Sequence, residues 1–349
     1  MERRTLLRLA ALAPVLLTGC AAAPASSALR FAPADSDKLT VYTSHPEKIR
    51  VPFIREFEDR TGIWVETVYG GTQEMLSRIE SEAGSPQADV MFGGGVESLT
   101  AYTEYFEAYE STERRAITRR EFASPEYLWT GFSALPLVFV YNTKLLDGGT
   151  APQTWAELAE PQWRGKIGFC SPEVSGSCYT AISTAIQLYG EEWLAGFVEN
   201  LNGTTLPQSN DIVPQVAAGA VMMGVTVESN AMLAIADGSD IGFLYPADGT
   251  SVVPDGVAIL SGAKNLGNAK KFVDFVLGAE AQTYLMEGPG RRPVRDGLPE
   301  LIIPALSDIP KMDYDVALAA ESRVEWMSLW QELFGEDGAQ AASAAEDSI

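Results

Sequence analysis

Residues 38–95 alternate between β-rich runs and an amphipathic helical pattern, and this alternation constrains the fold more than any other feature of the chain. The β-rich runs are KLTVYTS (38–44), IWVETVYGG (63–71) and ADVMFGGG (88–95). Between the first two, Ile49, Phe53 and Phe57 recur at helical spacing, and Gly62 follows as a C-terminal cap would. Strands alternating with helices build a mostly parallel sheet with right-handed crossovers, so the sequence predicts an α/β fold.

The rest of the chain continues this pattern. Further β-rich runs stand at 133–146 and 253–260, and a long amphipathic helix is expected over 267–287. A last helix is expected over 314–334, followed by an acidic tail of Ala and Ser, 335–349, that we expect to be disordered. With 349 residues, the chain is long enough for two domains with cores of their own.

The N-terminus has the pattern of an export signal. Arg3, Arg4 and Arg8 precede a short apolar run that ends in LTGC. Small residues directly before a cysteine resemble the lipobox of bacterial lipoproteins. The resemblance implies a signal peptide over residues 1–19 and lipid attachment to Cys20, whereas a non-lipidated signal peptide is the alternative.

The residues after Cys20 fit an anchored, exported protein. The small, polar, Pro-containing stretch 20–37 reads as a tether. We therefore expect the protein on the outer face of the cytoplasmic membrane, held there by lipid alone. In that oxidising compartment Cys170 and Cys178 form either a disulfide or two free thiols, and the sequence leaves both open.

Charge and motifs narrow the function classes. The formal net charge of −22 opposes binding to nucleic acid and adsorption to anionic lipid through the folded surface. One histidine, His45, rules out an H-E-x-x-H metal motif, and the chain has neither a G-x-S-x-G elbow nor a Cys-x-x-Cys pair. We expect no enzyme and no cofactor, with a hydrolase that uses paired carboxylates as the alternative from that class.

Several stretches together resemble a known family. They are LTVYTSHPEKIRVPFIREFEDRTGIWVE, GGTQEMLSRIESEAGSPQADVMFGGGVESL, PLVFVYNTKLL, TWAELAEPQWRGKIGF, SGSCYT, VAAGAVMMGVT, YPADGTSVVPDGVAIL and NAKKFVDFVLGAEAQ. In this order they look like the extracellular solute-binding proteins of ABC importers, in the ferric-binding-protein-like branch (solute-binding family 1) with the type II periplasmic-binding-protein fold. The resemblance covers about residues 39 to 290.

The resemblance implies two α/β lobes, each a mixed, mostly parallel sheet flanked by helices, with a ligand cleft between them. The first lobe would comprise 38–141 and 247–334, and the second 142–246. The partners implied are a small-molecule ligand and an ABC permease in the cytoplasmic membrane, and we expect a monomer.

Loops at strand ends and helix starts supply the candidate site, because ligands of open α/β sheets bind outside the carboxyl ends of the strands. Glycines there let backbone N–H groups approach a ligand, and helix N-termini favour anions without lysine or arginine. The candidate ligand-binding residues are Ser44, His45, Gly71, Thr72, Gly94, Ser175, Gly176, Ser177, Asn210, Asp211, Thr226, Glu228 and Ser251.

Several of these residues also have a purely structural interpretation. Ser44 with Glu47 has the pattern of a capping box, and Ser175 and Asp211 have the pattern of helix caps. Glu228 is equally compatible with a solvated loop.

The ligand stays open among three classes. A small organic anion, such as a phosphorylated sugar or a phosphonate, fits the anion-favouring loops best. Ferric iron is the alternative of the related branch, where adjacent tyrosines bind it, but this chain has no Tyr-Tyr pair and we expect no metal site. A polyamine or amino acid is the third class, suggested by the carboxylates Asp211, Glu228 and Asp255.

Overall fold

A computed structural model describes residues 33–146, 149–299 and 303–346 of the chain, with side chains up to Gly335. The chain divides after Asp35, and the strands and α-helices belong to the larger unit, Ser36–Ile349. The predicted signal peptide, Cys20 and most of the predicted tether lie outside the described residues.

The unit is a mixed α/β structure built on one strand network. Its strands are β1 (Lys38–Thr43), β2 (Trp64–Tyr69), β3 (Val90–Gly95), β4 (Phe106–Glu107), β5 (Thr130–Asn142), β6 (Ile167–Gly168), β7 (Met223–Val227), β8 (Ile241–Leu244), β9 (Val252–Leu260) and β10 (Arg292–Pro293). The strand order is β2-β1-β3-β9-β5-β7-β6, and β4, β8 and β10 pair beside this path. As the sequence predicted, β1 pairs in parallel with both β2 and β3. The expectation of a mostly parallel sheet is wrong, because β5 and β9 run antiparallel to all their partners and, among the described strands, only β6 and β7 form a further parallel pair.

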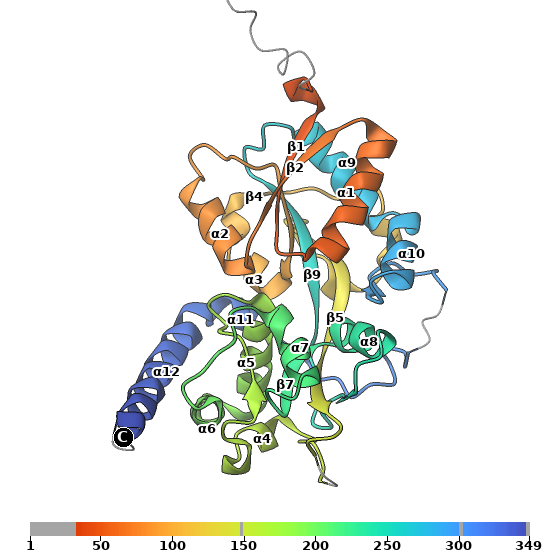
Figure 1. The fold of residues 1–349 in the computed structure, drawn as a ribbon. Coiled ribbons are helices and arrows are strands. Elements are labelled where there is room, and N and C mark those ends of the chain that lie inside the picture. Colours follow the sequence, from red (N-terminus) through yellow and green to blue (C-terminus); the bar gives the residue numbers. More distant parts are fainter. Residues whose placement is uncertain (1–32, 147–148, 300–302, 347–349) are drawn as a thin grey trace, which may run out of the picture. The chain divides into compact units, whose positions relative to one another are not determined.

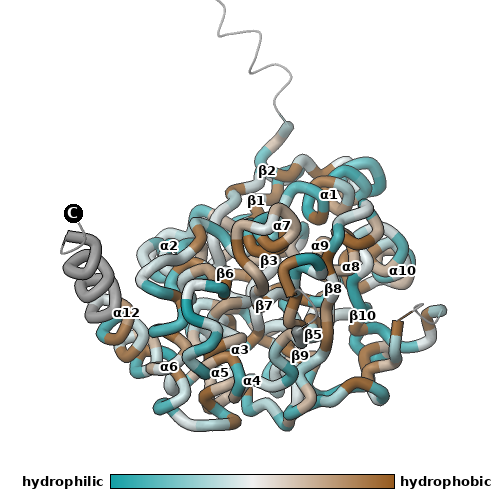
Figure 2. Tube along the Cα trace, turned by 60° about the horizontal axis from the view of Figure 1, so that its bottom comes forward, coloured by the Kyte–Doolittle hydropathy of each residue, from teal (hydrophilic) through white to brown (hydrophobic). Residues whose placement is uncertain are grey.

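The helices flank these strands (Figure 1). They are α1 (Glu47–Thr61), α2 (Thr72–Ser81), α3 (Val96–Thr100), α4 (Trp155–Leu158), α5 (Gly176–Tyr189), α6 (Glu192–Leu201), α7 (Ile212–Ala217), α8 (Glu228–Ala236), α9 (Leu266–Leu277), α10 (Ala279–Glu287), α11 (Val316–Glu321) and α12 (Arg323–Glu346). Figure 2 shows hydrophobic stretches on the central strands and hydrophilic ones on surrounding loops and helix faces.

Strand β5 connects two halves of the unit. Its residues Thr130–Pro136 pair with β9, and its residues Leu137–Asn142 pair with β7 and β8. We call the strands on the β9 side, β1–β4, β9 and β10, with their helices the first half, and β6–β8 with α4–α8 the second half. Strand β5 changes partners between Pro136 and Leu137, before the predicted lobe boundary at residue 141. The chain returns to the first half between β8 and β9, where the boundary at residue 246 was predicted.

Helix α1 illustrates how the sequence builds the first half. Ile49, Phe53, Ile54 and Phe57 are all buried, and Gly62 ends the helix in the left-handed conformation at φ 70°. That conformation costs a glycine nothing, because it has no Cβ to clash with the backbone. Pro52 lies inside the helix, which begins five residues earlier at Glu47.

The C-terminal helix differs from the prediction in two ways. The segment 247–334 was assigned to the first lobe, yet Trp326 and Trp330 of α12 are buried in the core of the second half, where Trp330 packs against Phe169. Helix α12 also continues to Glu346, through most of the tail predicted to be disordered. Alanine, glutamate and glutamine are strong helix formers, which accounts for this continuation.

Candidate functional site

A pocket of about 380 Å³ lies between the two halves, and we call it the central pocket. Nine of the predicted residues line it: Ser44, His45, Gly71, Thr72, Gly94, Ser175, Gly176, Ser177 and Asn210. The volume is in the range of pockets that hold a small metabolite and far exceeds that of a bare metal ion.

Three helices begin at the central pocket. The residue before each first turn, Pro46 of α1, Gly71 of α2 and Ser175 of α5, is a lining residue. The first amides of a helix have no partner within the helix, and the helix dipole adds partial positive charge there. Three such ends around one pocket favour a negatively charged group at their meeting point.

The two halves touch beside the central pocket. A methyl group added to Gly71 would lie 2.5 Å from the carbonyl oxygen of Val174, and one added to Gly176 would lie 2.9 Å from the Thr72 hydroxyl. Real Cβ atoms do not approach that closely, so glycine is required at this contact. Gly94 has a different constraint, a φ of 91° that side chains rarely adopt.

Ser175 acts as a helix cap as well as a lining residue. Its hydroxyl accepts a hydrogen bond from the Cys178 amide at 3.3 Å, and it shares a hydrogen bond of 3.1 Å with the Ser177 hydroxyl. The cap interpretation is therefore confirmed, and capping leaves the residue on the pocket wall.

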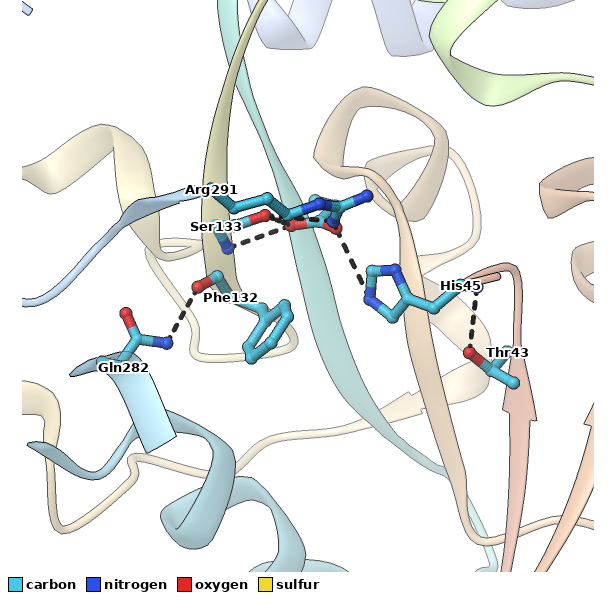
Figure 3. A network of polar contacts seen from close by, with 7 residues as sticks. Thr43, His45, Phe132, Ser133, Gln282 and Arg291 are labelled. Carbon is cyan, nitrogen blue, oxygen red and sulfur yellow. Dashed lines mark hydrogen bonds and ion pairs between the residues drawn. The ribbon is translucent and has the colours of Figure 1, made fainter. Parts of the chain in front are cut away.

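A buried charged cluster forms another part of the wall (Figure 3). Asp255 accepts a hydrogen bond of 2.6 Å from Nη1 of Arg291 and one of 2.9 Å from the Ser133 amide. Nε2 of His45 lies 3.4 Å from the same carboxylate. The Nε of Arg291 has no hydrogen-bond partner among the described residues, although the side chain is only 7% exposed. Arg291 lines the central pocket, while its Nε atom is itself buried in this structure.

His45 is buried and neutral. Its ring packs edge-on to Phe92, with centroids 4.5 Å apart, and lies 5.5 Å from Phe132. Burial lowers the pKa of His45 to about 3, against the opposing effect of Asp255. The ring therefore contributes a neutral hydrogen-bonding group to the wall.

The start of α1 differs from the predicted capping box. The N-cap is Pro46, the helix begins at Glu47, and no side chain in the described part of the chain caps it. The backbone amide of His45 donates to the Thr43 hydroxyl, so it is not free for a ligand. The proline ring fixes φ, and Pro46 is extended just before the helix, with φ −63° and ψ 161°.

Four predicted residues do not line the central pocket. Thr226 is buried and accepts a hydrogen bond from Asn230, which does line it. Glu228 is buried in an ion pair with Arg292, Ser251 is buried and accepts from the Thr184 hydroxyl, and Asp211 accepts from the Gln208 amide in a capping box. Side chains alternate between the two faces of a strand, and a capping side chain bonds to its own helix start. Both effects direct these side chains away from the pocket.

Sequence reasoning missed several polar lining residues, namely Tyr69, Glu74, Gln208, Ser209, Asn230 and Arg291, and it considered Asp255 solely as a partner for a cation. Tyr69 and Glu74 flank the predicted Gly71–Thr72 turn, so widening that turn would have found them. For Arg291 the available signal was an arginine pair between glycine and proline, GRRP, which is unusual for a solvated loop.

Cys170 and Cys178 are free thiols in the structure, and both are buried. A hydrogen bond between the two sulfurs, together with burial, raises the pKa of the Cys170 thiol. The disulfide alternative is therefore not realised in this structure.

The described residues contain no group of three or more His, Cys, Asp or Glu side chains arranged to hold a metal ion. They also include no helix that is both long and apolar enough to cross a membrane.

Comparison with known proteins identifies the class. The family model described as bacterial extracellular solute-binding protein matches residues 84–314, so the chain belongs to this family, whose members bind a solute for an ABC importer and catalyse no reaction. The fold is that of the type II periplasmic binding proteins, as predicted.

Three relatives are particularly informative. Iron uptake protein A1 of Synechocystis sp. is 28% identical over 81% of this chain and 83% of its own length. A periplasmic protein of Salmonella typhimurium, provisionally named as 2-aminoethylphosphonate-binding, is 25% identical over 79% of this chain and 81% of its own. The periplasmic binding protein AfuA of Actinobacillus pleuropneumoniae, solved with exogenous fructose-6-phosphate bound, is 26% identical with a TM-score of 0.79, over 85% of this chain and 98% of its own.

Proposed function

We propose that this solute-binding protein captures a small organic anion, such as a phosphorylated sugar or a phosphonate, and delivers it to its ABC importer. The observation that carries the proposal is the convergence of three helix N-termini on the central pocket, beside the unpartnered Nε of Arg291. Together these groups offer several N–H donors to one oxyanion, and the charge of Arg291 is already balanced by Asp255.

The remaining wall suits a ligand with neutral polar groups. Gln208, Ser209, Asn210 and Asn230 contribute amides and hydroxyls from the second half. Such groups bind hydroxyls or an amine through hydrogen bonds without adding charge. A compound with an anionic end and a polar remainder matches this division of the pocket, and AfuA, solved with fructose-6-phosphate, supports the same class.

Ferric iron fits the pocket less well, although iron-uptake proteins are among the relatives. Fe(III) is a hard ion that prefers phenolate and carboxylate oxygens. Tyr69 is the one phenol among the lining residues, and the Asp255 carboxylate already accepts bonds from Arg291 and Ser133. Tyr69 and Glu74 would be the hard oxygen donors left for an iron ion, too few to fill its coordination sphere without further donors.

The proposal includes the location and assembly of the protein. The Arg-rich start, the apolar run and LTGC favour a lipid anchor on Cys20, which would hold the protein beside its permease on the outer face of the cytoplasmic membrane. We expect a monomer that closes around its ligand, as hinged binding proteins do.

Thermal-shift screening of metal-stripped protein tests the ligand class, because a bound ligand stabilises the folded state by mass action. The probes are fructose-6-phosphate, 2-aminoethylphosphonate, inorganic phosphate, spermidine and ferric citrate. We expect stabilisation by a phosphate ester or a phosphonate. A calorimetric titration should then confirm the binding, with an affinity in the micromolar range at best. Stabilisation by ferric citrate or spermidine alone would contradict the proposal.

The double variant Ser175→Ala/Ser177→Ala tests the helix-terminus contact. Each lost hydrogen bond to a charged acceptor costs about 1.5–3 kcal/mol, so the affinity for the anion is expected to fall at least tenfold. Ser81→Ala, at an exposed position on α2 outside the central pocket, is the matched control. Unchanged affinity in the double variant would remove α5 from the binding site.

A further inference from the structure

An ion pair joins the two halves close behind the central pocket. Nε and Nη2 of Arg292 donate to the two carboxylate oxygens of Glu228 at 2.7 and 2.8 Å. The side chains are 5% and 2% exposed, so water does not screen the pair. The Tyr245 hydroxyl donates a further hydrogen bond to Glu228. The carboxylate therefore has three donors from two different segments.

These three residues come from both halves and from one of the connections between them. Arg292 belongs to β10, which pairs antiparallel with β5 on the first-half side, opposite Ala134. Glu228 is the first residue of α8 in the second half. Tyr245 lies in the segment between β8 and β9, where the chain returns to the first half. The contact thus joins both halves and one of the connections between them.

The sequence neighbours of the ion pair line the central pocket. Arg291 precedes Arg292, Val227 precedes Glu228, and Asn230 follows two residues later. Arg291 lines the central pocket, whereas Arg292, the first residue of β10, donates to Glu228 in the ion pair. A change in the separation of Arg292 and Glu228 would therefore change the separation of the pocket walls they adjoin.

We propose that Arg292 and Glu228, with Tyr245, are positioning residues that hold Arg291 and Asn230 at the separation required for ligand binding. The proposal rests on the central pocket being the ligand site, as proposed above. A bidentate arginine–carboxylate pair fixes both distance and orientation, which a single hydrogen bond does not. The residues act through the pocket walls and do not touch the ligand themselves.

The test compares Glu228→Gln, Tyr245→Phe and Arg292→Lys with the wild-type protein, with fructose-6-phosphate as the probe. Glu228→Gln keeps the shape of the side chain but removes its negative charge. Arg292→Lys keeps the positive charge but loses the two parallel N–H donors of the guanidinium group. We expect Glu228→Gln to weaken binding at least tenfold, chiefly through faster dissociation, and the other two variants to have smaller effects in the same direction. The matched control is Glu113→Gln, which breaks the ion pair with Arg295 within the first half and is expected to leave affinity within twofold.

Solution scattering supplies a readout that does not depend on the ligand. The ligand-free Glu228→Gln protein is expected to have a larger radius of gyration than the wild-type protein, whereas Glu113→Gln should not. If the wild-type protein binds neither fructose-6-phosphate nor another anion, the proposed ligand class is wrong. The radius of gyration of the ligand-free variants still shows whether the ion pair holds the two halves together. A folded Glu228→Gln variant with unchanged radius of gyration and unchanged affinity would overturn the positioning role. If Glu228→Gln does not fold, the same two measurements on Arg292→Lys and Tyr245→Phe decide it.

Discussion

Arg291 and Asp255 form a buried ion pair on the wall of the central pocket, with Nη1 2.6 Å from the carboxylate. The side chains are 7% and 4% exposed. Because the pair is neutral as a whole, the guanidinium is held in place without excess positive charge. Its Nε is buried and has no hydrogen-bond partner among the described residues.

Replacing Arg291 with lysine removes the Nε donor and keeps the positive charge. Lysine can keep the ion pair with Asp255, but it has no equivalent of Nε in the guanidinium plane. We expect the affinity for the anion to fall by about 1.5–3 kcal/mol, or about 10–150-fold, in calorimetric titrations. Arg295→Lys is the control, because Arg295 lies in the same segment but does not line the central pocket. Equal affinities of Arg291→Lys and wild-type protein would exclude Arg291 from ligand binding.

His45 should make folding stability depend on pH below neutrality. Its pKa is lowered to about 3 in the folded protein by burial, whereas the unfolded chain has a pKa of about 6.5. In that window the unfolded state binds more protons, so stability is complete above about pH 6.5 and is lost as pH falls toward 3. The loss between about pH 7.5 and about pH 4.5 should amount to about 2–3 kcal/mol in urea titrations.

The variant His45→Gln isolates this contribution from the carboxylates that titrate in the same range. The groups facing the ring are Asp255, Arg291 and Arg50, and all three remain in the variant. The difference in stability between wild-type protein and variant should therefore become smaller or change sign on acidification. A difference that is constant between the two pH values would show that His45 does not titrate in this way.

The two buried cysteines should react only when the protein unfolds. Cys170 and Cys178 are at most 1% exposed, and the thiolate of Cys170 is disfavoured by its raised pKa. In a Cys20→Ala variant, we expect slow labelling by a thiol reagent in buffer and two equivalents of label in denaturant. Fewer than two equivalents in denaturant without reductant would indicate that the disulfide forms after all.

The fold was predictable because each element carries its own periodic signal. The helical spacing of Ile49, Phe53 and Phe57 and the cap Gly62 predicted α1 and its C-terminal end without any tertiary information, although not its N-cap. The same reasoning failed for α12, since nothing local distinguishes a helix that packs on the second half from one that packs on the first. Trp330 contacts Phe169, a residue far from it in the sequence, and local sequence patterns do not encode such a contact.

The candidate site was predictable where it is made of loops at strand ends and helix starts. Gly71, Gly94 and Ser175 have residue types that such turns require. Side-chain direction was the part that failed: Thr226 and Val227 are adjacent in β7, yet Val227 lines the central pocket and Thr226 does not. Arg291 comes from a segment far along the chain, and its place opposite Asp255 follows from the pairing of β10 with β5.

Gly71→Ala should weaken ligand binding by keeping the two halves apart. The added methyl group would lie 2.5 Å from the Val174 carbonyl oxygen, a backbone atom that cannot rotate away. Gly71 has an ordinary φ of −63°, so the variant introduces no backbone strain of its own. Relief therefore requires the loop before α2 and the loop before α5 to separate, at a cost of about 1–3 kcal/mol that appears as a loss of affinity of about 5–150-fold.

Calorimetry with fructose-6-phosphate measures this loss of affinity. Gly267→Ala in α9, where the added methyl group meets nothing within 4 Å, is the matched control and should bind as the wild-type protein does. Equal affinities of Gly71→Ala and Gly267→Ala would mean that the close contact between the halves at Gly71 is not part of the ligand-bound state.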